Sequence, residues 1–285
     1  MAAAVSAGSR MEPTFIPLEK PMSSASPAHD RLNAALVELM RQQTGGDTKE
    51  VEVMGKNFIV LPEVFNVATV QNILEYLAHS PLKIVSEELD KRGPETALDL
   101  LEIGPGMGHF VVCAASLGPN IHVTAVDINP SAVENVKMNA ARHGVLERVS
   151  CTVGDVYKAS VTAGKTFDII FWDPPFSRGA DSLREHTQLE RAVWDPGYEG
   201  LTQYIACARE FLKPQGRLLL GWNNFFGDGE FLTDIATKHS WHIKTYGEAH
   251  FPLGPSYQTF LSYELISHER ATTCPTCGQI AASSR

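Results

Sequence analysis

Apolar and polar positions along the chain change their pattern near residue 94. Before that point, apolar residues recur at helical spacing between Asp30 and Thr44 and again over 68–78, and a hairpin pattern covers 51–61. After Gly93, short apolar strands alternate with helical segments. This alternation predicts a largely parallel sheet that is covered by helices on both faces.

Strands and helices can be assigned in the second part of the chain. The predicted strands are 97–103, 122–127, 149–153, 167–172, 217–222, 241–246 and 259–266, and the predicted helices are 108–117, 130–143 and 199–212. No helical pattern separates the last two strands, so we expect them to pair antiparallel at one edge. The fold class is therefore α/β: a doubly wound, Rossmann-like sheet of seven strands with an antiparallel last strand pair, plus a small N-terminal helix–hairpin extension.

The same pattern divides the chain into four parts. We expect residues 1–27 to be disordered, because small and polar residues and four prolines dominate them. Residues 28–93 form the helix–hairpin extension with a segment in front of the main domain. Residues 94–270 form the α/β domain, and residues 271–285 form a C-terminal tail.

The composition narrows the classes of function. The apolar fraction of 44% is ordinary for a soluble protein, and no stretch approaches the roughly 18 consecutive apolar residues of a membrane helix. The N-terminus lacks the charged-then-apolar order of a secretory signal, so we expect a cytoplasmic location. The net charge of −9, without a basic run, argues against binding to bulk nucleic acid. The oligomeric state stays open.

Two of the five cysteines, Cys274 and Cys277, form a Cys-x-x-Cys pair near the C-terminus. Two thiolates supply half of the ligands of a structural zinc site. His268 could add a third ligand, but no fourth is near. We therefore expect an exposed tail without metal and keep zinc binding as the alternative.

A glycine-rich turn, residues 104–108, follows the first strand of the α/β domain and reads Gly-Pro-Gly-Met-Gly. Glycines at such a turn let the backbone approach a nucleotide-like ligand closely, although strand–helix turns also use glycine for structural reasons alone. Asp127 ends the second strand about 20 residues later, which suits the two hydroxyls of a ribose. Glu102 precedes the turn, where its carboxylate would repel a pyrophosphate but can attract an amino group. Together these features favour S-adenosylmethionine over a nicotinamide dinucleotide.

Two further acidic residues follow the third and fourth strands. Asp155 can accept the amino hydrogens of an adenine ring, although an aspartate in a simple turn looks the same. The fourth strand runs into Asp-Pro-Pro-Phe, residues 173–176. The prolines hold the chain extended and leave the Asp173 carboxylate and the Pro174 carbonyl as acceptors for a planar –NH2 group. Phe176 can stack on the group that bears this nitrogen, so the motif predicts methyl transfer to nitrogen.

These residues together resemble class I S-adenosylmethionine-dependent methyltransferases with an [Asp/Asn]-Pro-Pro-[Tyr/Phe] motif, nearest to the release-factor glutamine methyltransferase (HemK-like) and small-domain methyltransferase group. The resemblance covers about residues 55–266 and includes the segments 60–65, 126–132 and 189–204. It implies that residues 94–270 are the methyltransferase domain and that segment 60–65 covers the cofactor. The cofactor that it implies is S-adenosyl-L-methionine, bound by Glu102, Gly104, Pro105, Gly106, Gly108, Asp127, Ile128, Asp155 and Val156. It implies that the target nitrogen is held by Asp173, Pro174, Pro175 and Phe176.

The methyl acceptor is left open by the sequence. Our main interpretation is transfer to a planar amine or amide nitrogen of a small molecule or of a peptide or protein side chain. The alternatives are an RNA or DNA base (adenine N6 or guanine N2) and a non-catalytic cofactor-binding module. The resemblance implies that Asp at position 173 is commoner in enzymes that methylate the exocyclic amines of bases. Candidate substrate contacts are Phe65, Trp194, Tyr198, His250 and Tyr257.

Overall fold

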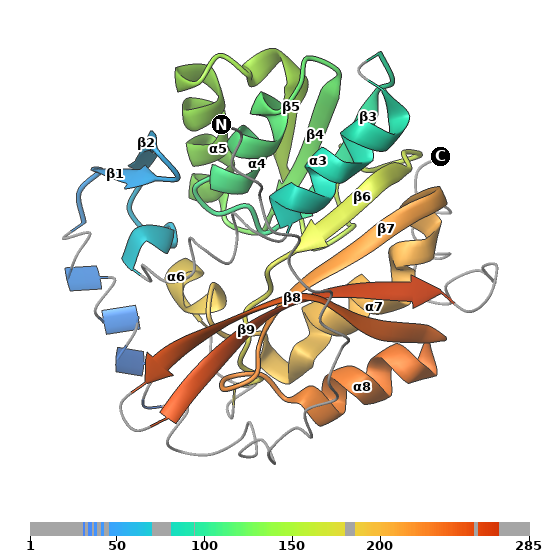
Figure 1. Ribbon diagram of the computed structural model, residues 1–285. Helices are drawn as coiled ribbons and strands as arrows, with labels where there is room; N and C mark the ends of the chain where they lie inside the picture. Colours follow the sequence, from blue (N-terminus) through green and yellow to red (C-terminus); the bar gives the residue numbers. More distant parts are fainter. Residues whose placement is uncertain are drawn as a thin grey trace, which may run out of the picture.

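The computed structural model describes residues 31, 34–35, 37–38, 41–42, 46–69, 81–93, 95–179, 186–253 and 256–267, with only the backbone described at 251–253 and 256–258. Its central element is a sheet of seven strands (Figure 1). The strands are β3 (Leu98–Ile103), β4 (Ile121–Asp127), β5 (Val149–Val153), β6 (Phe167–Trp172), β7 (Leu212–Asn223), β8 (Trp241–Leu253) and β9 (Ser256–Ser267). Their order is β5-β4-β3-β6-β7-β9-β8, and β9 pairs antiparallel with β7 and β8 while the other pairs are parallel. The predicted doubly wound sheet with an antiparallel last pair is therefore confirmed.

Helices cover both faces of this sheet (Figure 1). One layer consists of α3 (Pro81–Arg92), α4 (His109–Ser116) and α5 (Pro130–Arg142), and the other contains α7 (Glu199–Phe211) and α8 (Gly229–Lys238). Successive side chains of a strand point to opposite faces. In β3, Leu98 and Leu100 accordingly pack with the first layer, whereas Leu101 and Ile103 pack with the second. Two apolar cores therefore hold the sheet between the helices.

The strand order reverses direction between β3 and β6. From β3 the chain moves outward through β4 to β5, and then returns to add β6 and β7 on the other side of β3. The carboxyl ends of neighbouring strands separate at such a switch point, and ligands of open α/β sheets bind in the crevice there. The glycine turn follows β3 and the Asp-Pro-Pro-Phe motif follows β6, so the topology brings the two motifs together.

The short elements lie outside the sheet. A hairpin of β1 (Lys49–Val53) and β2 (Lys56–Val60) precedes the 3-10 turn η1 (Val67–Thr69), and further short elements are η2 (Leu146–Arg148), α6 (Gln188–Arg191) and η3 (Pro196–Tyr198). Among the described residues, no helix has both the length and the apolar character needed to cross a membrane. The predictions for residues 1–27, for most of the helix 68–78 and for Cys274 and Cys277 concern residues that the structure does not describe. The domain boundaries stay predictions.

Within the described residues, the structure adds the helices α3 and α8, the short helix α6 and longer strands to the predicted elements. The pattern gave no helix at α3, because its inner face includes the buried, charged Glu88 beside its apolar residues. The helix α8 was also missed, so a helix does separate β7 from the last strand pair. The strand predicted over 241–246 continues to Leu253. A register shift leaves Tyr246 unpaired as a bulge, and regular pairing resumes at Gly247.

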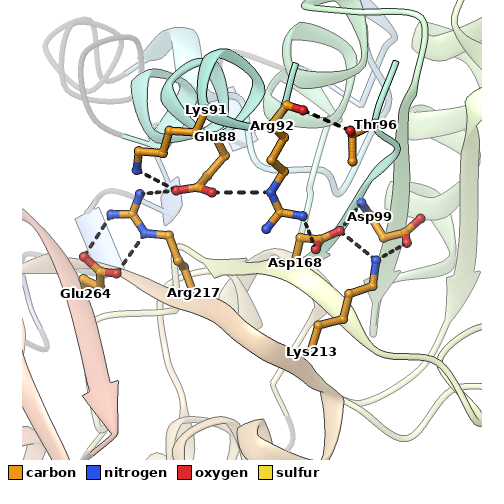
Figure 2. Close-up of polar contacts among 9 residues, drawn as sticks. All are labelled: Glu88, Lys91, Arg92, Thr96, Asp99, Asp168, Lys213, Arg217 and Glu264. Carbon is orange, nitrogen blue, oxygen red and sulfur yellow. Dashed lines mark hydrogen bonds and ion pairs between the residues drawn. The ribbon is translucent and has the colours of Figure 1, made fainter. Parts of the chain in front are cut away.

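An ion-pair network crosses the sheet at the starts of its central strands, at the edge opposite to the two motifs (Figure 2). Asp168, at the start of β6, accepts hydrogen bonds from Arg92 at 2.5 Å and from Lys213 at 2.8 Å. The backbone N–H of Asp99 donates to the same carboxylate at 2.8 Å. Burial raises the pKa of Asp168, but these donors outweigh it and hold the pKa below its ordinary value.

Replacing Asp168 with alanine is expected to lower the free energy of unfolding by about 3 kcal/mol. The change removes the buried carboxylate that Arg92 and Lys213 share, and their side chains are 27% and 30% exposed. Arg92 then keeps Glu88 at 3.5 Å, and Lys213 keeps Asp99 at 2.5 Å. Because the folded-state pKa of Asp168 is lowered, its contribution is present above the ordinary carboxyl pKa and is lost as the pH falls through the lowered value. Urea unfolding at pH 7, and again well below the ordinary aspartate pKa of about 3.9, measures both effects. Equal stability of variant and wild type at pH 7 would contradict this assignment.

Candidate functional site

A cavity of about 470 Å³ lies at the carboxyl ends of β3, β4, β5 and β6. Four stretches that follow or end these strands line it: 102–107, 126–129, 154–156 and 171–176. The segment between the hairpin and η1, and residues of α6 and α7, complete the wall. The glycine turn and the Asp-Pro-Pro-Phe motif, which the sequence analysis identified, therefore line the same cavity.

The glycine turn exposes its backbone to this cavity. Gly106 adopts a φ of 53°, and a Cβ at this position would meet nothing within 4 Å, so a ligand can approach the backbone. Gly108 begins α4 with a φ of 79°, and a Cβ there would lie 3.0 Å from a methyl group of Val136. A side chain at position 108 would therefore push the turn away from α5.

Asp127 braces the same turn from the end of β4. One carboxylate oxygen accepts the Gly106 N–H at 3.1 Å, and the other accepts the Asn129 N–H at 2.8 Å. Burial raises the pKa of Asp127 to about 6, and these two N–H groups oppose the rise. The carboxylate therefore fixes the position of Gly106 through this hydrogen bond, without any ligand.

Glu102 lies at the end of β3 with 3% of its surface exposed. Within the described residues, its Oε2 oxygen is buried without a hydrogen-bond partner. Burial first, and then the charges of Asp127 and Asp173, hold the pKa of Glu102 well above its ordinary range. Three neighbouring carboxyl groups at one end of the cavity suit a ligand that brings hydrogen-bond donors or positive charge.

Asp173 presents a second unsatisfied oxygen to the cavity. Its Oδ1 atom is buried and has no hydrogen-bond partner in the part of the chain that the structure describes. Burial raises the pKa of Asp173 to about 7. Phe176, three residues on, packs its ring edge-on against Trp222 and Phe260, with ring centres 6.3 and 5.9 Å away. The motif therefore presents one unpaired acceptor, Asp173 Oδ1, and one aromatic ring, Phe176, that is fixed by its neighbours.

The turn after β5 forms the remaining end of the cavity. The Gly154 N–H donates to the Asp127 carbonyl at 3.0 Å, which joins this turn to the end of β4. Val156 takes a left-handed φ of 51° and is buried, while Asp155 lies 3.9 Å from the Lys158 ammonium. Ile128 also lines the cavity and keeps 40% of its surface exposed, so it offers an apolar surface beside these polar groups.

A comparison with known families decides the classification. The sequence profile of the methyltransferase small domain family matches residues 82–247, which is more than half of the chain. The chain belongs to this family. The match contains the glycine turn, Asp127 and the Asp-Pro-Pro-Phe motif, so most of the cavity wall lies within the matched residues.

Curated relatives of the domain differ in what they methylate. A bifunctional methyltransferase of Rickettsia conorii is 29% identical over 52% of this chain and 29% of its own length. A tRNA1(Val) (adenine(37)-N6)-methyltransferase of Porphyromonas gingivalis is 31% identical over 42% of this chain and 48% of its own length. A release factor glutamine methyltransferase of Koribacter versatilis is 30% identical over 61% of this chain and 60% of its own length. The chain thus spans less than two thirds of each of these relatives.

A solved structure shows the same fold. The S-adenosylmethionine-dependent methyltransferase of Agrobacterium tumefaciens superposes with a TM-score of 0.50 at 18% identity, over 77% of this chain and 70% of the other. At this identity the likeness concerns the fold alone.

The candidate substrate contacts fall in different places in the methyltransferase small domain. Phe65 and Trp194 line the cavity, and the Trp194 ring stacks on that of His186 at 5.8 Å. His250 lies on β8, where its Nδ1 atom is 2.9 Å from the Thr259 hydroxyl, and Tyr257 lies on β9. His250 is not among the described residues that line the cavity, and the side chain of Tyr257 lies outside the part of the chain that the structure describes.

Tyr198 lies behind the wall rather than in it. The residue is fully buried, its hydroxyl donates to the Phe176 carbonyl at 2.7 Å, and the Asp228 N–H donates to this hydroxyl at 2.9 Å. Burial raises the pKa of Tyr198, so the hydroxyl stays protonated. The structure thus places Tyr198 as a support for the Asp-Pro-Pro-Phe motif.

The substitution Tyr198→Phe is expected to lower the free energy of unfolding by about 1–3 kcal/mol, because the Phe176 carbonyl and the Asp228 N–H lose a buried partner. Turnover should fall as Phe176 shifts, while affinity for the cofactor stays near wild type. Thermal unfolding, together with kcat measured apart from KM, checks both parts. A loss of cofactor affinity with full turnover would assign Tyr198 elsewhere.

Three further residues of the wall were not assigned to the site from the sequence. Both ring nitrogens of His109 are buried without partners among the described residues, and burial lowers its pKa to about 4. The Oε1 atom of Gln188 is likewise buried and unpaired there. Asp195 accepts the Gly200 and Leu201 N–H groups at 3.1 and 2.8 Å, and burial raises its pKa to about 6. A lone His, Gln or Asp carries no spacing signal; only the tertiary contacts identify them.

Proposed function

We propose that this chain is an S-adenosylmethionine-dependent methyltransferase that methylates a planar amide or amine nitrogen of a peptide or protein side chain or of a small molecule. The observation that carries the proposal is the buried, unpaired Oδ1 atom of Asp173. It lines the same cavity as the open glycine turn and the carboxylates of Glu102 and Asp127. A buried acceptor without a donor is costly unless a ligand supplies the donor.

The residues around the cavity fit this cofactor. The unpaired Oε2 atom of Glu102 suits the amino group of the methionine part, and the exposed backbone of Gly106 allows close approach. Asp127 would accept the ribose hydroxyls, while Asp155 and the apolar side chain of Ile128 would hold the adenine. When bound, S-adenosylmethionine supplies a methyl group on a positively charged sulfur, which also suits the acidic surroundings.

The Asp-Pro-Pro-Phe motif would orient the acceptor. Asp173 and the Pro174 carbonyl would accept the two hydrogens of a planar –NH2 group, which fixes the direction of its lone pair. Holding two groups in the correct geometry lowers the barrier by several kcal/mol (about 7–11 in the best intramolecular cases). As the nitrogen gains its methyl group it must lose a proton, and the Asp173 carboxylate is the group placed to accept it.

The charge of the wall supports an acceptor without phosphate groups. Seven acidic residues line the cavity: Glu63, Glu102, Asp127, Asp155, Asp173, Asp195 and Glu199. The basic residues of the described wall are Lys158 and Arg191, and Lys158 lies 3.9 Å from Asp155. A nucleic acid would bring its phosphates toward this negative surface, at an energetic cost that low salt increases.

A nucleic-acid base is the second candidate acceptor. The tRNA adenine-N6 methyltransferase of P. gingivalis favours it, since it matches this chain at 31% identity. Asp173 also favours it, because the resemblance implies that aspartate at this position is commoner in enzymes that methylate the exocyclic amines of bases. Tight, strongly salt-dependent binding to bulk RNA would promote this candidate over the first.

The pH dependence of methyl transfer should report Asp173. Burial raises its pKa to about 7, and the ionised form is the one that accepts hydrogens. We therefore expect kcat/KM for the acceptor to rise with pH and to reach half its maximum near pH 7. A profile measured from pH 5 to 9 tests this, and the rise should be absent in Asp173→Asn. The same rise in Asp173→Asn would assign it to another group.

Methyl transfer from labelled S-adenosylmethionine tests the proposed function. The purified chain is offered peptides with amide and amine side chains, a soluble protein extract and total tRNA in parallel. We expect label in the peptide or protein pool. Label in tRNA alone would move the assignment to the second candidate, and no label in any pool despite cofactor binding would point to a non-catalytic module.

A further inference from the structure

One face of α5 carries two buried asparagines whose amides bind backbone rather than side chains. Asn135 and Asn139 lie one helical turn apart, and both are fully buried. The Oδ1 atom of Asn135 accepts the Leu61 N–H at 2.9 Å, and its Nδ2 donates to the Ile59 carbonyl at 2.7 Å. The Oδ1 atom of Asn139 accepts the Ile59 N–H at 2.8 Å. The two amides therefore bind the chain at the end of β2 as a neighbouring strand would.

Asn139 also reaches the glycine turn. Its Nδ2 atom donates to the Ile59 carbonyl and to the Met107 carbonyl, both at 2.8 Å. Met107 stands between Gly106 and Gly108 in the turn that faces the cavity. One side chain thus joins the N-terminal segment to the glycine turn, and every hydrogen-bonding atom of its amide is used.

A third asparagine extends the contact along the same segment. Asn129, which precedes α5, donates from Nδ2 to the Glu63 carbonyl at 2.8 Å, while its Oδ1 caps the helix at Ser131 N–H. Glu63 begins the stretch that, with Phe65, forms a wall of the cavity. Three asparagines on or before α5 therefore bind the backbone of residues 59–63, and Glu63 at the end of this stretch lines the cavity.

The hairpin also has contacts with the C-terminal end of α5 that do not involve the glycine turn. At its exposed end, Arg142 binds the Glu50 carboxylate with two hydrogen bonds of 3.0 and 3.1 Å, and a ring nitrogen of His143 lies 2.9 Å from the Asn57 carbonyl. Exposed ion pairs contribute little to stability. These contacts attach the hairpin to α5, but of the contacts described here only that of Asn139 links it to the glycine turn.

We propose that Asn139, with Asn135, is a positioning residue that couples the N-terminal wall of the cavity to the glycine turn. The two sides then form one binding surface for the cofactor instead of two that must be ordered separately. The inference rests on the proposed function, because it takes the cavity to be the cofactor site. The coupling also gives a role to Asn135 and Asn139, which do not line the cavity themselves.

Coupling of this kind has a consequence for the wild-type protein. If the segment around Ile59 and Leu61 helps to form the site, a ligand in the site must in turn stabilise that segment. Bound S-adenosylhomocysteine should therefore slow hydrogen exchange at the amides of Ile59 and Leu61. The exchange of residues at the opposite edge of the sheet, such as Asp99, should change less.

The substitution Asn139→Ala tests the coupling directly. It leaves Ile59 and Met107 without their shared partner. We expect S-adenosylmethionine, titrated well below the unfolding temperature, to bind about tenfold more weakly, a factor within the range usual for coupled sites. Arg142→Ala, which removes an exposed attachment of the same hairpin, should bind within about twofold of wild type. Asp168→Asn serves as a control for loss of stability far from the site.

The outcomes separate the inference from the proposed function. Unchanged affinity in Asn139→Ala, with tight binding by the wild type, would overturn the coupling and leave the function standing. Absence of binding by the wild type would instead overturn the proposed function. If Asn139→Ala does not fold, the exchange experiment on the wild type decides, and amides of Ile59 and Leu61 that the ligand does not protect would overturn the coupling.

Discussion

Replacing Asp173 with alanine is expected to lower methyl transfer by about 10³-fold while S-adenosylmethionine still binds with near wild-type affinity. The reason is local: the alanine removes a buried side-chain oxygen of the Asp-Pro-Pro-Phe motif that lacks a partner in the described structure. It also removes the group placed to take the proton. The measurement is kcat with the acceptor that the wild type labels, together with a titration of the cofactor.

Asp173→Asn is the matched control for this result. The amide keeps the shape and one acceptor oxygen, but it cannot take up a proton, and its –NH2 group is a donor. We expect its turnover to lie between that of the wild type and that of the alanine variant. Full activity in Asp173→Ala would mean that another group holds the target nitrogen.

Replacing Asp127 with alanine is expected to weaken S-adenosylmethionine binding by about 1–3 kcal/mol, or roughly 5- to 150-fold. The structure supplies two reasons for a large effect. The carboxylate is placed to accept the ribose hydroxyls, and it already accepts the N–H groups of Gly106 and Asn129. Its loss therefore removes a ligand contact and loosens the turn that bears the ligand. Calorimetric titration measures the change.

Asp127→Asn distinguishes the two contributions. It retains one acceptor oxygen, so it should preserve more of the turn while losing the charge. We expect an intermediate affinity, and turnover at saturating cofactor should remain close to wild type in both variants. Equal affinity of wild type and Asp127→Ala would remove Asp127 from the cofactor site.

The sheet and the position of its site followed from local sequence. The strand that leads into residues 104–108 and the strand that leads into Asp173 consist mostly of apolar residues, which is typical of buried parallel strands. The glycine turn and the two prolines mark the ends of these strands through backbone geometry alone. Such signals survive without tertiary information, so the cavity could be predicted before the fold was seen.

Side chains whose role depends on distant contacts could not be placed in this way. Asn135 and Asn139 look like the polar face of an amphipathic helix, yet both are buried because β2 lies against them. Tyr198 follows Pro-Gly and has the appearance of a loop aromatic, but its hydroxyl joins Phe176 to Asp228, 22 and 30 residues away. Glu88 interrupted the apolar pattern of α3. Its charge is balanced by Arg217, which lies on β7 and is far away in the sequence.

The central claim is that this cavity binds S-adenosylmethionine, and the most direct test is a calorimetric titration of the purified protein with that cofactor, with NAD as the paired control. We expect saturable binding of S-adenosylmethionine, with a dissociation constant on the order of micromolar (about −8 kcal/mol), and no binding of NAD. Binding of NAD instead, or of neither compound, would contradict the assignment of the glycine turn, Glu102 and Asp127 to this cofactor.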